Sequence, residues 1–227
     1  MRKIRKLCHL SIKYKTWHDA IEAAQGPHPK YNSSKNEFYW DVVMNLLHCQ
    51  GGLCAYTEML LCSDEMFNQG KWSDGCYAIN PEFKPQTKGQ LEHFDRTLKD
   101  KKAWLWNNLF MVDTDINTKV KGTHSVDPIL KPDADDYDEF QKLDYDFAEH
   151  IFIANVHLPE DIRARVTTMI ITLGINFGPV KAARRRCLER IVKLIEFGIE
   201  SWSTISVDEF PTACEMLRRR LNNSITP

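Results

Sequence analysis

The stretch Gln90-Leu-Glu-His-Phe-Asp95, followed after a basic segment by Trp106-Asn-Asn-Leu-Phe-Met-Val-Asp-Thr-Asp-Ile-Asn-Thr-Lys-Val-Lys-Gly122, carries the most specific pattern in this chain of 227 residues. An acid and a histidine, Glu92 and His93, are adjacent in an apolar setting. Asn108 follows fifteen residues after the histidine, and Asn117 nine residues later. The chain therefore contains a His-Asn-Asn series with a carboxylate beside its first member.

Each residue type in this series suits metal-assisted cleavage of a phosphodiester bond. Mg²⁺ prefers a few oxygen ligands and keeps several waters, and a carboxylate and an amide oxygen provide such ligands without filling the coordination shell. A neutral imidazole nearby can take the proton from the attacking water. The residues indicate a hydrolase that uses one divalent cation, Mg²⁺ or Mn²⁺.

The segment resembles the HNH endonuclease motif, a ββα-metal hairpin followed by a helix, in the version whose last position is Asn. The resemblance implies that Glu92 is a metal ligand and that His93 is the general base. It implies that Asn108 braces the hairpin and orients the histidine, and that Asn117 is the second metal ligand.

Three further residues near the end of the segment complete the predicted site. Asp115, two residues before the last asparagine, is a further candidate metal ligand. Lys119 and Lys121 precede Gly122 and are similar to the Lys-Gly ending of the motif. We expect these two lysines to contact substrate phosphate.

Many members of the family also carry two pairs of zinc-binding cysteines, and this chain keeps one of the four. Cys54 stands at the first position, Thr57 replaces its partner, and the second pair would fall on Asp113 and Ile116. A thiolate zinc site needs four soft or borderline ligands, so we expect no structural zinc and a core position for Cys54. Glu58 either supports the site or has a surface or capping role.

Most of the remaining chain resembles, in pattern, the PtuB family of HNH nuclease subunits from Septu-type and retron-associated anti-phage systems. The shared features are a basic N-terminal opening, a helix before Gly51, an acidic connector, and a helix containing Leu-Gly-Ile-Asn176 that is followed by an Arg-rich one. The resemblance implies DNA as the substrate, with RNA as an alternative, and a PtuA-like ATPase as the partner.

Composition and charge exclude other classes of protein. The chain is 43% apolar and 27% charged, and no apolar run approaches the ~18–20 residues of a membrane span. The basic N-terminus is not followed by the apolar region of a signal peptide, and the seven cysteines include no CxxC pair. We expect a cytoplasmic protein without membrane contact. The chain lacks GxGxxG and P-loop patterns, so a nucleotide-dependent enzyme has little support.

The formal net charge of −1 hides a segregation of charge along the sequence. Nine carboxylates face two lysines between Asp127 and Glu149, whereas residues 1–50, 84–122 and 162–227 are basic. Such sorting either presents a cationic face to a polyanion or reflects ordinary solvated surfaces. The same two alternatives apply to the helix that carries Arg184–Arg186, for which we expect a surface position.

Helical spacing of apolar residues, with capping residues and breaks, predicts four helices. They span residues 36–48 up to Gln50-Gly-Gly, residues 158–176, a helix opened by Pro179, and a short helix from Ser206 with Glu209 in a capping box. Frequent Gly and Pro from Ser63 to Lys88 predict loops and short strands. We expect an α+β fold with a basic helical segment (1–49), a ββα-metal nuclease module (50–124), and an acidic connector with a C-terminal helical region (125–227).

The other histidines and tryptophans near these segments have ordinary structural interpretations. We expect His124 to be an exposed loop residue, and His150 and His157 to be structural, because no carboxylate lies at ligand spacing from them. Trp104 and Trp106 could stack on bases, but core packing of the hairpin is the commoner use of such residues.

A rival interpretation belongs to a different class of function. The chain could be a catalytically idle HNH-like scaffold that binds nucleic acid or the ATPase partner, since a protein that has lost the zinc cysteines could have lost its activity as well. Against this stands the retention of His93, Asn108 and Asn117 together with the acid beside the histidine.

Overall fold

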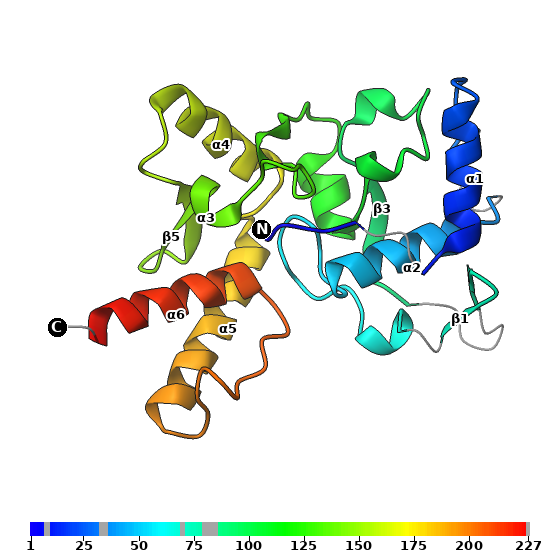
Figure 1. The fold of residues 1–227 in the computed structure, drawn as a ribbon. Coiled ribbons are helices and arrows are strands. Elements are labelled where there is room, and N and C mark those ends of the chain that lie inside the picture. The colour runs from blue at the N-terminus through cyan, green and yellow to red at the C-terminus, as the bar shows by residue number, and fades with distance from the viewer. Residues whose placement is uncertain (7–9, 32–35, 69–70, 79–85, 226–227) are drawn as a thin grey trace. The chain divides into compact units, whose positions relative to one another are not determined.

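The computed structural model describes residues 1–6, 10–31, 36–68, 71–78 and 86–225. These residues form helices and three two-stranded antiparallel sheets, which confirms the predicted α+β class (Figure 1). They fall into two compact units. Ile4–Ala55 with Leu60–Val126 make the first, here the hairpin unit, and Met1–Lys3, Tyr56–Met59 and Asp127–Pro227 make the second, here the C-terminal unit.

The hairpin unit contains the elements around the predicted site. In chain order they are α1 Ile12–Ala23, α2 Tyr39–Gln50, η1 Asp64–Met66, β1 Trp72–Ser73, β2 Cys76–Tyr77, β3 Gly89–His93, η3 Arg96–Leu98, η4 Trp106–Asn108, β4 Leu109–Asp113 and the π-helical η5 Ile116–Lys121. Helix α2 confirms the helix predicted from residue 36, and it ends where Gly51 takes φ 60°. Short strands and loops occupy the described part of 63–88, as predicted, whereas 69–70 and 79–85 lie outside the described residues.

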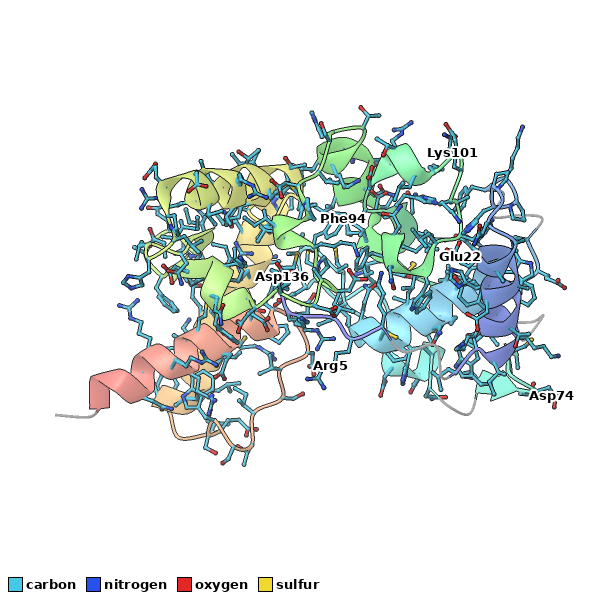
Figure 2. The ribbon with its side chains drawn as sticks, turned by 45° about the horizontal axis from the view of Figure 1, so that its top comes forward. Arg5, Glu22, Asp74, Phe94, Lys101 and Asp136 are labelled. Atoms are coloured by element: carbon cyan, nitrogen blue, oxygen red, sulfur yellow. The ribbon has the colours of Figure 1, made fainter. Side chains whose placement is uncertain are left out.

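The core of this unit lies between α2 and the β3–β4 hairpin (Figure 1). The buried side chain of Gln50 donates to the Met111 carbonyl at 2.8 Å and accepts from its N–H at 2.9 Å. Each of these buried bonds contributes about 1 kcal/mol, and together they satisfy backbone groups at the free edge of β4. Figure 2 shows Phe94, whose ring packs edge-on against Phe110 of β4.

Several residues near the hairpin are buried as the sequence predicts. Trp104 and Trp106 are core residues, and so is Cys54. The Cys54 sulfur accepts from the Asp113 N–H at 3.4 Å. The carboxylate of Asp113 accepts from two N–H groups at the start of η5 and so caps that helix.

The C-terminal unit combines three long helices with one hairpin. Its elements are η6 Pro128–Leu130, α3 Glu139–Lys142, β5 Leu143–Asp146, β6 Ile151–Ala154, α4 Glu160–Thr172, α5 Gly178–Glu196 and α6 Pro211–Ile225. The β5–β6 hairpin was not predicted; β5 lies in the acidic stretch Asp127–Glu149, and β6 follows that stretch. In β5, Leu143 and Tyr145 are buried while Asp144 and Asp146 face outward, which is the alternation of a half-buried strand.

Two helix ends differ from the sequence prediction. Helix α4 ends at Thr172 instead of continuing to residue 176, because Gly174 takes φ 66° and reverses the chain. Helix α6 begins at Pro211, whereas Ser206 lies in a loop and donates to Asp208. The predicted start at Ser206 was wrong because proline, which lacks an N–H, fits the first turn of a helix.

Arg184 is buried, although the sequence placed it on the polar surface of its helix. Its guanidinium donates to the Ile175 carbonyl and the Asn176 side chain, both at 2.9 Å, and to the His150 carbonyl at 3.1 Å. It also lies over the Phe152 ring, 4.8 Å from the centroid. Arg184 therefore belongs to the core, where its two terminal nitrogens donate to oxygens of His150, Ile175 and Asn176, and its neighbours at 185 and 186 remain exposed.

Glu58 has the capping role that the sequence left open, but it is buried and not at the surface. Its carboxylate accepts from the N–H of Thr212 at 2.9 Å in the first turn of α6, and also from the Thr212 hydroxyl. An acidic group at a helix N-terminus satisfies free N–H donors and interacts favourably with the helix dipole. No described helix is long and apolar enough to cross a membrane.

Candidate active site

A polar hollow of about 570 Å³ lies in the hairpin unit at the end of β3. Its wall includes Glu92, His93 and Asn117, three of the residues selected from the sequence, together with Arg96 and Lys99. Strand pairing places Glu92 opposite Phe110 and His93 opposite the first residue of β4, Leu109. The hairpin therefore carries the acid–histidine pair, and η5 brings Asn117 to the same hollow.

His93 is buried and fixed in one orientation. Its Nε2 lies 2.8 Å from the carbonyl oxygen of Ala103, which can only accept, so Nε2 carries the hydrogen. Nδ1 has no hydrogen-bond partner among the described residues and is free to accept a proton. Burial lowers the pKa of His93 to about 4, so the ring is neutral at pH 7. The Tyr31 ring packs edge-on against it, with centroids 5.2 Å apart.

Glu92 is buried and paired with a lysine that is buried completely. The Lys121 ammonium donates to Glu92 Oε1 and to the His93 carbonyl at 3.2 Å, and its side chain has no exposed surface. Burial raises the pKa of Glu92, and the charge of Lys121 opposes that shift. The structure thus places Lys121 against the predicted metal ligand, away from the solvent where a substrate phosphate would arrive.

Asn108 ties together the two strands of the hairpin. Its buried amide accepts from the Asp95 N–H at 2.8 Å and donates to the Asp95 carbonyl at 2.9 Å. Its own carbonyl accepts from the Phe94 N–H at 2.8 Å. These three bonds hold the chain immediately after His93, so Asn108 acts on the histidine through the backbone.

The remaining predicted residues divide between the hollow and the exposed surface. Asn117 lines the hollow and donates its amide N–H to the Gln90 side chain at 3.3 Å, a bond that does not use its amide oxygen. Asp115 and Lys119 form an exposed ion pair of 2.8 Å and do not line the hollow. His124 is exposed and also lies outside its wall, as the sequence predicts.

The oxygen donors at the hollow fit a hard divalent cation. Glu92 and Asn117 provide one carboxylate and one amide, a set that Mg²⁺ accepts when water or substrate oxygens complete its shell. No group of three or more His, Cys, Asp or Glu side chains suited to a metal occurs in the part of the chain that the structure describes.

Arg96 and Lys99 are two cations at the hollow that the sequence did not single out. They lie on and directly after η3, in the basic segment between the two halves of the motif. The only signal in the sequence was the basic character of that segment, which does not distinguish these two cations from neighbouring lysines. No protein-family model and no curated protein sequence matches this chain.

Proposed function

We propose that this chain is a metal-dependent HNH-type endonuclease that hydrolyses phosphodiester bonds in DNA. One observation carries the proposal: a neutral, buried imidazole, whose Nδ1 has no hydrogen-bond partner in the described part of the chain, shares a hollow with a carboxylate and an amide, on a hairpin followed by a short helix. That combination of groups serves general-base hydrolysis of an anionic ester.

In the proposed reaction, His93 Nδ1 takes a proton from a water molecule while the water oxygen forms a bond to phosphorus. The bond between phosphorus and the leaving oxygen breaks, and that oxygen receives a proton from solvent. The Ala103 carbonyl holds Nε2–H and stabilises the imidazolium that forms. A divalent cation held by Glu92 and Asn117 would supply stabilisation of the negative charge on the phosphate and the leaving oxygen.

The wider resemblance to PtuB nucleases supports a cellular role for this activity. We propose that the chain works in the cytoplasm beside a PtuA-like ATPase in defence against phages. The basic segments of the sequence agree with a nucleic-acid substrate.

A specific contact favours the rival function, an HNH-like scaffold without activity. The ammonium of Lys121 already neutralises Glu92, where an active enzyme would bind a cation. In a scaffold this ion pair would replace the metal permanently and preserve the shape of the hollow for binding alone.

The two functions are separated by nicking of supercoiled plasmid in Mg²⁺ or Mn²⁺, measured with and without any ATPase that co-purifies. The wild-type chain is expected to nick the plasmid, whereas His93→Ala binds DNA but does not cleave it. His124→Ala is the matched control, since that histidine is exposed and outside the hollow. DNA binding without cleavage under every condition would support the scaffold, whereas equal nicking by wild type and His93→Ala would overturn the role of His93 as the base.

A further inference from the structure

We propose that Arg96 and Lys99 form an anion-binding site that holds the phosphodiester backbone beside His93. This inference rests on the proposed nuclease function for its role in the reaction, and it names the part of the substrate that the chain grips. The residues expected from the sequence to do this, Lys119 and Lys121, are both engaged elsewhere.

Position is the first reason for the assignment. Arg96 and Lys99 line the same hollow as Glu92 and His93. The Lys99 ammonium lies 4.8 Å from the centroid of the Tyr31 ring, and that ring in turn lies 5.2 Å from the His93 ring. A phosphate held by these two cations would therefore lie next to the proposed base.

Availability of charge is the second reason. Lys102, Lys119 and Lys121 each form an ion pair with a carboxylate, which neutralises them. Arg96 and Lys99 form no ion pair with any carboxylate of the described residues. Two cations without an ion pair among the described residues, at the wall of a polar hollow, attract an anion, and the guanidinium can bind two non-bridging phosphate oxygens at once.

The third reason is that the turn carrying these cations is fixed in advance. Asp95 caps the N-terminus of helix η3, and its carboxylate accepts from the Thr97 N–H at 2.9 Å. The backbone of Asp95 is held on both sides by the buried amide of Asn108. The side chain of Asn108 thus also sets the position of Arg96. A preorganised site loses less entropy when the phosphodiester backbone binds.

The chemistry of this site predicts recognition of the backbone and not of the bases. Phosphate contacts position a nucleic acid but carry no sequence information. DNA and RNA share the diester group, so the site is expected to bind both, with little preference for sequence.

The test is a titration of fluorescently labelled oligonucleotides, one DNA duplex and one RNA of the same sequence, in EDTA so that no cleavage occurs. Arg96→Gln and Lys99→Gln are each expected to weaken DNA binding roughly tenfold at about 0.1 M salt. For duplex DNA, the log of the association constant falls linearly with the log of the salt concentration, and each variant should make this slope less steep by about 0.9. Lys119→Gln, on the exposed side of η5, is the control and should change neither quantity.

Lys99→Arg extends the test, because arginine keeps the positive charge that Lys99→Gln removes. This variant should show the salt dependence of the wild-type chain. Unchanged affinity and slope in both Gln variants would overturn the inference, as would absence of binding by the wild-type chain at low salt. An effect confined to DNA or to RNA would also contradict recognition through the diester group.

The outcome is separable from that of the proposed function. If the wild-type chain does not cleave DNA but the Gln variants lose affinity, the anion site stands without the nuclease chemistry. If the wild-type chain cleaves DNA and the Gln variants bind as well as it does, only the anion site is overturned.

Discussion

The ion pair between Lys121 and Glu92 sets the charge balance of the hollow. Both side chains are buried, so each charge has lost most of its hydration and depends on the other for stabilisation. The same ammonium holds the His93 carbonyl, which links the acid and the histidine through one residue. A cation bound at Glu92 would therefore act beside an existing positive charge, which makes Lys121 relevant to metal affinity as well as to stability.

Lys121→Met is expected to lower the free energy of unfolding by roughly 3 kcal/mol, because it leaves the Glu92 carboxylate buried without its counter-charge. The loss lies at the low end of the range for such pairs, since Glu92 can take up a proton once the lysine is gone. Urea denaturation followed by tryptophan fluorescence measures it.

The double variant Lys121→Met/Glu92→Gln should recover much of that loss, because no buried charge then lacks a partner. Lys119→Met removes an exposed charge and should cost less than about 0.5 kcal/mol. Equal losses in the two single lysine variants would show that the buried pair has no special role.

Among the elements, the β3–β4 hairpin depends on one side chain for its geometry. Asn108 closes the hairpin through Asp95, and Asp95 begins the turn that carries Arg96. Packing against α2 stabilises the strands, but it does not fix the backbone after His93. Asn108 therefore links the position of the proposed base, His93, to that of the proposed anion site at Arg96.

Asn108→Ala should lower the free energy of unfolding by about 1–3 kcal/mol, because the partly buried N–H and carbonyl of Asp95 lose their partners. It should also weaken oligonucleotide binding by displacing Arg96. The matched control is Asn107→Ala, which changes the exposed neighbour. Thermal unfolding and the EDTA binding titration measure both effects, and equal results for the two alanine variants would contradict the bracing role.

The sequence predicted those helix boundaries that are set by residues at the boundary itself. Glycine after α2 and the proline in the first turn of α5 mark boundaries that the structure confirms. The β5–β6 hairpin escaped prediction because its outward-facing aspartates make the segment look like an acidic loop. The burial of Arg184 escaped prediction because the carbonyls that accept from its guanidinium, those of His150 and Ile175, lie outside its own helix.

At the scale of the whole molecule, the two compact units are not continuous in sequence. Tyr56–Met59 belongs to the C-terminal unit although it lies between segments of the hairpin unit. Glu58 reaches Thr212 across 154 residues, and no local pattern encodes such a contact. The candidate site shows the same limit of local patterns. The motif selected Glu92, His93 and Asn117, which share the hollow. Residue types alone did not reveal that Lys121 pairs with Glu92 or that Arg96 lines the hollow.

The central claim is that His93 removes a proton from water in a metal-dependent cleavage of DNA. The most direct measurement is the nicking rate of His93→Gly with and without added imidazole. The variant should be slower than wild type by about 10² or more, and imidazole should restore part of the rate only when Mg²⁺ or Mn²⁺ is present. Nicking by His93→Gly at the wild-type rate without imidazole would contradict the claim.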